Sequence, residues 1–256
     1  MAVWPTGFTG QQSSRILTWL IGRVKEDIFK LAFSALVYSS MVRACRKNSQ
    51  TFRLIIDTFF GYTFYEYAMD ALEALHLRVS APRLGGEVPS RVILDNMFKA
   101  ALRAPDHAQL RPWRFLLVAG TDRDRLGDVF VQAQLQDDPE LSDAAIAKAR
   151  GKPRRAPLII VVIASTREHP KVPEIEQLLS AGAAAQNMLI AAHAQGIGAM
   201  WRTGGMAYHA TVLHALGLQS NEKLMGFLYV GSIDGKSRVA RHLETAEYFK
   251  SWPDIN

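Results

Sequence analysis

Seven consecutive apolar residues, Leu158 to Ala164, constrain the fold of this chain more than any other segment. The run has no polar position, so it lacks the two-residue alternation of a strand that has one face in water. Its β-branched residues favour a strand, and a strand that is apolar on both faces must be covered on each side. The run therefore predicts a buried strand in a layered protein of helices and sheet.

Helical and strand-like patterns alternate around this run. Ser90 is placed to cap one helix with its hydroxyl, and Gly196 is placed to end the longest one. The patterns show no internal repeat. They predict helices at 70–77, 90–102, 122–135, 140–150, 174–195 and 208–216, and strands at 114–119, through Met200 and Trp201, and at 224–230.

The composition divides the chain at Met69. Residues 1–68 hold 13 of the 24 aromatic residues, and 8 of the 30 basic and 4 of the 24 acidic residues. The remaining 22 basic and 20 acidic residues are interspersed over 69–256, which argues against a nucleic-acid-binding face there. Met69 also heads an amphipathic run. We therefore expect one domain at 69–256, preceded by an N-terminal extension, 1–68, that is not part of it.

The extension leaves one alternative open. It has no acidic residue before Glu26 and contains Arg15 and Arg23, as a transit peptide would, although no signal-peptide cleavage pattern follows. Its longest apolar stretch, 31–42, is shorter than the roughly 20 residues that span a bilayer, so no membrane segment is predicted. The single cysteine, Cys45, excludes an intramolecular disulfide, and the cytoplasm is the default location.

No self-contained catalytic machinery is present in the sequence. It lacks a zinc-binding His-Glu-x-x-His, a Gly-x-Ser-x-Gly elbow and a phosphate-binding Gly-x-x-x-x-Gly-Lys. His209 and His214 are five residues apart, so a helix would not place them on one face to bind a metal. Gly196 and Gly198 begin a dinucleotide fingerprint, but Trp201 stands where its third glycine belongs. We expect no protein nucleophile and no metal, and chemistry that resides in a bound cofactor.

Four segments carry anion-binding groups, stacking groups or small residues. They are Arg78-Val79-Ser80, Arg103 to His107 with Pro112 to Phe115, Ser180 to Leu189, and Gly196 to Thr203. In this order and spacing they resemble the NAD(P)H-dependent FMN nitroreductases, particularly small members whose chains begin Met-Asp-Ala-Leu-Glu, as Met69 to Glu73 do. The resemblance covers nearly all of 69–256.

The resemblance implies an α+β nitroreductase fold. Its central sheet is mixed and mainly antiparallel, with a parallel component and helices on both faces, and its subunits form an intertwined homodimer. Small residues from Ala181 to Ala185 allow a close helix contact. That contact is either internal to one subunit or, as the resemblance implies, joins two copies of the helix, with FMN at the subunit interface.

The resemblance also implies the site residues. A guanidinium and a hydroxyl in Arg-x-Ser suit a phosphate, although such a pair alone is more often simply solvated. Charges just after a helix end, such as Arg103, also complement the helix dipole. Arg111 stands where the family usually has a Gln before Pro-Trp, so the sequence does not establish whether residue 111 contacts the flavin. By resemblance, FMN is held by Arg78, Val79, Ser80, Trp201, Arg202 and Thr203, and by Arg103 and His107 of the partner, while Ala191, Ala192, His193, Ala194, Gln195 and Gly196 match the NAD(P) stretch.

The implied activity is NAD(P)H-dependent reduction of nitroaromatic, quinone or similar electron-poor acceptors by a ping-pong mechanism. Two alternatives remain open from the sequence. One is flavin reduction, enone reduction or dehalogenation on the same fold. The other is a flavin-binding protein without turnover.

Overall fold

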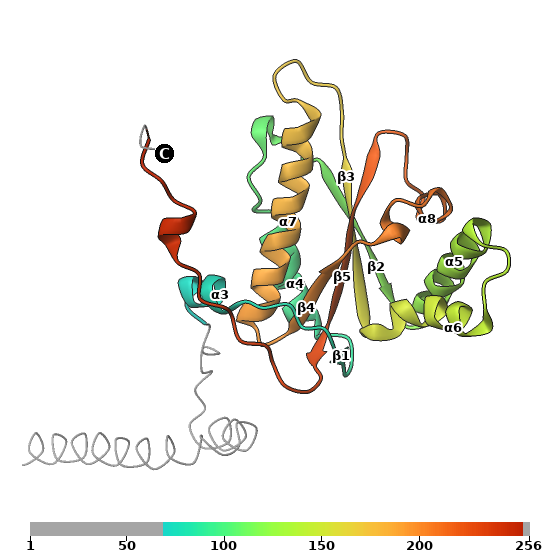
Figure 1. Ribbon diagram of the computed structural model, residues 1–256. Coiled ribbons are helices and arrows are strands. Elements are labelled where there is room, and N and C mark those ends of the chain that lie inside the picture. The colour runs from blue at the N-terminus through green and yellow to red at the C-terminus, as the bar shows by residue number, and fades with distance from the viewer. Residues whose placement is uncertain (1–68, 253–256) are drawn as a thin grey trace, which may run out of the picture. The chain divides into compact units, whose positions relative to one another are not determined.

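The computed structural model describes residues 69–252, so the predicted extension at 1–68 lies outside the described residues. The described chain alternates helices and strands, as the patterns predict (Figure 1). Its helices are α3 (Ala71–Leu77), α4 (Arg91–Ala101), α5 (Asp122–Asp137), α6 (Asp143–Gly151), α7 (Glu174–Ala194) and α8 (Ala210–Ala215). Its strands are β1 (Leu84–Gly85), β2 (Trp113–Ala119), β3 (Leu158–Ser165), β4 (Gly198–Arg202) and β5 (Glu222–Ile233).

The strands form one sheet in which β3 lies between β2 and β5. β4 pairs with the opposite edge of β5, because residues 227–230 of β5 pair with β3 and β4 at once. β1 pairs with the end of β5. Every pairing within residues 69–252 is antiparallel. The mainly antiparallel α+β sheet is confirmed, and the expected parallel component is not found among the described strands.

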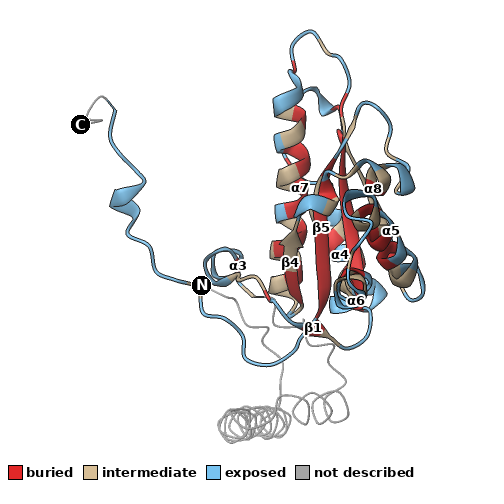
Figure 2. Ribbon diagram, turned by 45° about the vertical axis from the view of Figure 1, so that its right-hand side comes forward, coloured by how far each residue is buried: buried red, intermediate tan, exposed pale blue. Residues whose placement is uncertain are grey.

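The apolar run forms β3, and its residues are at most 2% exposed. Ile159, Val161 and Ile163 enter one core cluster, with residues of α5 and α8. Leu158, Ile160 and Val162 enter the other, with residues of α4 and α7. The strand is covered on both sides, as an unbroken apolar run requires. Figures 1 and 2 show α4 and α7 on one side of the sheet, α5 and α8 on the other, and buried residues between them.

The small residues of α7 mostly pack inside the subunit. Ala181, Ala184 and Ala185 are fully buried, and the last two belong to the core cluster beneath α4 and α7. Gly182 and Ala183 are partly exposed. The close contact that these residues permit is therefore internal for the three buried alanines, and only the outer residues are available to a second copy.

Of the two helix caps predicted from the sequence, the structure contains one. Gly196, at φ 72°, ends α7 as expected. Ser90 precedes α4 at the capping position, but its hydroxyl makes no capping hydrogen bond, so this prediction is wrong in its mechanism. Side-chain caps exist instead at α3, where Asp70 accepts from the amides of Leu72 and Glu73, and at α6, where Ser142 accepts from Ala145.

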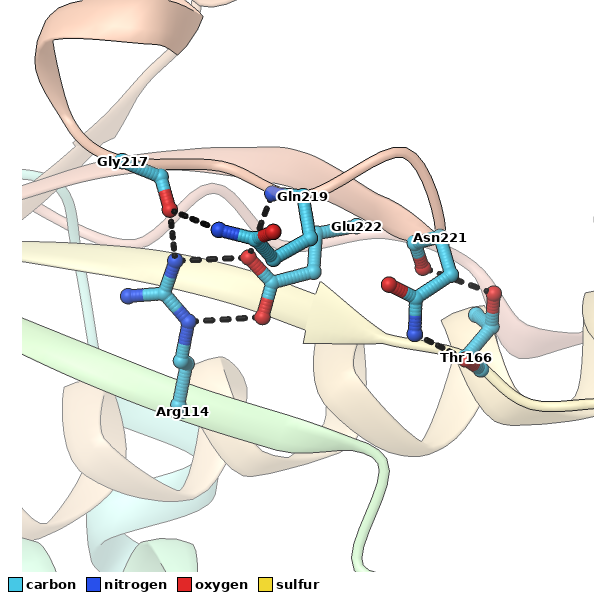
Figure 3. Close-up of polar contacts among 6 residues, drawn as sticks. All are labelled: Arg114, Thr166, Gly217, Gln219, Asn221 and Glu222. Atoms are coloured by element: carbon cyan, nitrogen blue, oxygen red, sulfur yellow. Dashed lines mark hydrogen bonds and ion pairs between the residues drawn. The ribbon is translucent and has the colours of Figure 1, made fainter.

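A partly buried ion pair ties β2 to the start of β5 (Figure 3). Nε and Nη2 of Arg114 each donate to a carboxylate oxygen of Glu222 at 2.6 Å, and Nη2 also donates to the carbonyl of Gly217 at 3.0 Å. The side chain of Glu222 is 5% exposed. The hydrogen bond from Arg114 is the main cause that lowers the pKa of Glu222 from 4.5 to about 2.

We expect Glu222→Gln to lower the free energy of unfolding by about 1.5–3 kcal/mol near pH 7, because a charge-assisted pair is lost. The pKa of Glu222 is lower in the folded than in the unfolded chain. Its contribution is therefore complete above pH 4.5 and is lost as the pH falls toward 2. Urea unfolding at pH 6 and pH 3.5 should show a smaller pH-dependent loss in the variant than in the parent.

The control is Glu174→Gln, which breaks an ion pair with Lys223 in which both side chains are about half exposed. Such a surface pair contributes at most about 1 kcal/mol. An equal loss in both variants would show that Glu222 is no more important than a surface charge.

Candidate functional site

Arg78 stands at the end of α3, where its amide donates to the carbonyl of Ala74 at 3.1 Å. Its side chain is partly buried and makes no hydrogen bond or ion pair with another residue of 69–252. It lies close to His193 near the end of α7: burial, and then the charge of Arg78, lower the pKa of His193, while Glu73 opposes them. Nε2 of that imidazole is buried and has no partner among the described residues. The guanidinium of Arg78 therefore has no partner among the described residues, and its charge disfavours the protonated form of His193.

The segment after Arg78 runs along β4. The amide of Ala81, next to Ser80, donates to the carbonyl of Ala199 at 3.1 Å. Nη2 of Arg202 donates to the carbonyl of Pro82 at 3.2 Å. Gly198 permits this approach, because a Cβ there would lie 3.2 Å from the Cβ of Ala81. The fold thus brings the predicted Arg78-Val79-Ser80 segment next to the predicted Trp201-Arg202-Thr203 segment.

Trp201 and Arg202 point to opposite faces of the sheet. Trp201 packs against the α4 and α7 cluster, and its Nε1 donates to the carbonyl of Met225 at 3.0 Å. The guanidinium of Arg202 lies over the ring of Tyr229, 5.4 Å from its centre, on the face that α5 and α8 cover. Thr203 is exposed. The three adjacent residues therefore present side chains to different surroundings.

One nitrogen of the Arg202 guanidinium has no hydrogen-bond acceptor among the described residues. Its Nε is buried and has no partner within the described part of the chain. Burial is the main cause that lowers its pKa, and Arg155 adds to this effect. No carboxylate of residues 69–252 forms an ion pair with Arg202. The arginine is therefore a cation that lacks a counter-ion among residues 69–252.

Gly226 is a sterically constrained residue beside the candidate site that the patterns missed. It has φ 139° and lies at the irregularity in the pairing of β3 with β5, between Val162 and Ile163. A Cβ there would lie 2.4 Å from Nε1 of Trp201 and 2.8 Å from the carbonyl oxygen of Arg202. A glycine inside a predicted strand is the sequence signal for such a close approach.

Arg103 and His107 follow α4 on a tightly held loop. Arg103 is exposed. The carboxylate of Asp106 accepts from the amides of Leu110 at 3.1 Å and Arg111 at 2.6 Å. Ser180 of α7 donates to the carbonyl of Pro105 at 2.7 Å. Nδ1 of His107 lies 2.9 Å from Oε2 of Glu176, at the start of α7. The loop therefore sits against the first half of α7.

Arg78 and His107 are consequently at opposite ends of α7. His107 contacts Glu176, whereas Arg78 lies beside His193. These two α7 residues are 17 positions apart, which corresponds to about 25 Å along a helix. The predicted FMN residues therefore form two groups, one around Arg78 and one around His107. Within one subunit the two groups are too far apart to contact the same flavin.

The stretch matched to NAD(P) is largely occupied by internal contacts. Ala192 is fully buried. The side-chain amide of Gln195 donates through Nε2 to the carbonyls of Ala191 and Ile93, and its Oε1 accepts from Asn96 of α4. Ala194 is partly buried and Gly196 is exposed. The side chains of this stretch mainly join α7 to α4.

Neither a membrane-spanning helix nor a cluster of metal ligands is found among residues 69–252. No described helix is long and apolar enough to cross a membrane. No group of three or more His, Cys, Asp or Glu side chains in that range is arranged to hold a metal ion.

Comparisons with known proteins address the fold and the family. YdjA of Escherichia coli K12, named as a candidate NAD(P)H nitroreductase, is 44% identical over 164 residues, which are 64% of this chain and 88% of YdjA. A nitroreductase-like protein of Bacillus cereus has a crystal structure with a TM-score of 0.61 and 23% identity, covering 74% of this chain and 98% of that one. A candidate nitroreductase of Desulfovibrio desulfuricans, solved in complex with FMN, has a TM-score of 0.54 and 25% identity, covering 71% and 96%.

The family model agrees with these relatives. The model described as the nitroreductase family matches residues 84–232, more than half of the chain. The match runs from the first residue of β1 to Ser232, so it includes all five described strands except the last residue of β5. The chain belongs to the nitroreductase family.

Proposed function

We propose that this protein is an FMN-dependent oxidoreductase that uses NAD(P)H to reduce electron-poor acceptors such as nitroaromatics or quinones. Family membership supports the proposal, as do the FMN in the Desulfovibrio relative and the naming of YdjA as a candidate NAD(P)H nitroreductase. Bound FMN would take a hydride from NAD(P)H and pass electrons to the acceptor, in a ping-pong order. The cysteine content is compatible with the cytoplasm, which we keep as the proposed location.

The residues around Arg78 fit an anionic cofactor. Arg78 and Arg202 lack carboxylate partners within residues 69–252. The buried Nε2 of His193, whose pKa the charge of Arg78 lowers, and the buried Nε of Arg202 itself also have no partner there. Uncompensated cations and orphaned donors are costly unless an anion or acceptor satisfies them. We propose that Arg78 and Ser80 bind the FMN phosphate and that Val79, Arg202 and Thr203 hold the rest of the cofactor from the adjoining β4 segment. Trp201 would act by positioning that segment.

We infer that the active form is a homodimer, and one observation carries this inference. The two groups of predicted FMN residues are about 25 Å apart along α7, so a single subunit does not bring both to one flavin. A second copy would supply Arg103 and His107. The outer face of α7 also exposes apolar side chains, with Ile175 at 59% and Leu179 at 66% exposed. Exposed apolar residues of this size on one helix face fit a surface that a second copy covers.

We expect Leu179→Glu to dissociate the dimer and release FMN together, because it places a charge in an apolar contact. Sedimentation velocity, recorded at both the flavin and the protein absorbance, measures both effects. Tyr208→Glu is the matched control, because Tyr208 is 72% exposed and lies in a different segment, before α8. A monomeric variant that keeps its FMN would contradict the shared site.

We further propose that residues 69–256 are sufficient for folding and FMN binding. The family match begins at residue 84, and the run from Met69 forms the cap and body of α3. A protein that begins at Met69 should keep the flavin content and melting temperature of the full chain. Loss of either would place residues 1–68 within the functional domain.

The deciding experiment for the activity is an anaerobic spectrum of the purified full chain. FMN absorbance should bleach on addition of NADH or NADPH and return when a nitroaromatic or quinone is added. Steady-state assays with flavins, enones and halogenated substrates then separate reactions on the same fold. Bound FMN that neither nucleotide bleaches would favour a flavin-binding protein without turnover.

A further inference from the structure

The loop that carries His107 is held in an unusual backbone conformation. Ala108, Gln109 and Arg111 have φ between 49° and 59°, a region that residues other than glycine occupy at a cost. Such conformations persist only where the surroundings impose them, and they concentrate at functional sites. Asp106 imposes this one, because its carboxylate accepts from two amides of the loop and its carbonyl accepts from Gln109 at 3.2 Å.

The start of α7 is equally fixed. Gln177 is 1% exposed. Its side-chain oxygen accepts from the backbone amide of Arg167, and its side-chain nitrogen donates to the carbonyls of Arg167 and Val172. Arg167 in turn donates to the carbonyl of Leu110. The loop and the first turns of α7 therefore form one connected unit, and it places His107 opposite Glu176.

We propose that Glu176 is a positioning residue for His107, which it holds with Nε2 directed away from α7 and toward the FMN of a second subunit. The 2.9 Å contact between Nδ1 and Oε2 is its direct basis. An ionised carboxylate only accepts hydrogen bonds, so Nδ1 carries the hydrogen in this pair. Nε2 makes no hydrogen bond within residues 69–252, and the imidazole is 62% exposed, so this nitrogen is available to a ligand.

The chemistry explains why an exposed pair would matter. An imidazole without such a partner exchanges between two tautomers and turns about its side-chain bonds. A carboxylate bound to one nitrogen selects a single tautomer and a single orientation for the other nitrogen. The inference rests on the proposed function, because it gives Nε2 a flavin as its partner.

The test compares Glu176→Ala, Glu176→Gln and the parent as full-length proteins. Nitrogen-15 NMR of the imidazoles, with the His107 signals identified by their loss in His107→Gln, reports which ring nitrogen carries the hydrogen. The parent should show Nδ1 protonated, and Glu176→Ala should show a mixture of tautomers. FMN titration of the apoproteins should show about a tenfold weaker affinity for Glu176→Ala, at the lower end of what loss of such a supporting group causes. Glu176→Gln retains an acceptor oxygen and should lie between the two.

Glu174→Gln is the control, because Glu174 lies in the same helical turn and pairs with Lys223 instead. It should change neither the tautomer nor the FMN affinity. An unchanged tautomer in Glu176→Ala, an unchanged FMN affinity, or an equal effect of Glu174→Gln would each overturn the proposal. The NMR measurement needs no cofactor, so a parent protein that binds no FMN would refute the proposed function while the pairing of Glu176 with His107 is still tested.

Discussion

Gly226→Ala should lower the free energy of unfolding by about 2–4 kcal/mol and displace Trp201. A methyl group at this position would lie 2.4 Å from Nε1 of Trp201 and 2.8 Å from the backbone oxygen of Arg202. Overpacking of this kind costs roughly 1–3 kcal/mol, and the φ of 139° adds about 1–3 kcal/mol for a residue with a Cβ. The backbone oxygen cannot turn away as a flexible side chain could, so strand β4 has to move.

The displacement is measurable apart from the loss of stability. For a chain of this size, about 2–4 °C of melting temperature is lost per kcal/mol, so we expect a fall of roughly 5–15 °C. The tryptophan emission assigned to Trp201, by comparison with Trp201→Phe, should shift as the indole loses its bond to Met225. Gly205→Ala is the control, because a Cβ there meets no atom within 4 Å. Equal melting temperatures for the two variants would contradict the steric role of Gly226.

Long periodic segments were predictable because their cause is local. The unbroken run at 158–164 could only be a strand covered on both faces, and α7 could be recognised from its length and its final Gly196. β1 could not be recognised, because two residues carry no pattern and the strand exists only through its pairing with Ser232 and Ile233. The same pairing accounts for the last two residues by which β5 extends beyond the predicted 224–230, whereas residues 222 and 223 pair with β3.

The sequence predicted which residues form the candidate site better than it predicted how they are arranged. A strand through Trp201 already implies that its neighbour Arg202 faces the other way, because side chains alternate along a strand. Glu176 carries no comparable signal, since it meets His107 across 69 residues of sequence. The separation of Arg78 from His107 likewise follows only from where α3 and the 104–111 loop dock on α7, which no local pattern encodes.

Arg78→Ala should weaken FMN binding by about one to two decades for each hydrogen bond lost. Charge-assisted hydrogen bonds to a phosphate contribute roughly 1.5–3 kcal/mol each, and about 1.4 kcal/mol corresponds to one decade. The fold should survive, because the partly buried Arg78 side chain bonds to no other described residue and its backbone capping contact remains. Excess FMN should therefore restore part of the lost activity. The pKa of His193 should rise in the variant, since Arg78 helps to lower it in the parent.

Riboflavin separates a phosphate contact from a general effect on the site. It lacks the phosphate, so its affinity should change little in Arg78→Ala, and titration of the apoprotein with both flavins measures the difference. Arg91→Ala serves as the matched control, because Arg91 is an exposed arginine that pairs with Asp95 on α4. Equal losses of FMN and riboflavin affinity would place Arg78 away from the phosphate. Unchanged FMN affinity would show that Arg78 does not contact FMN. The inference that a dimer is needed would then lose its basis, because it depends on FMN residues at both ends of α7.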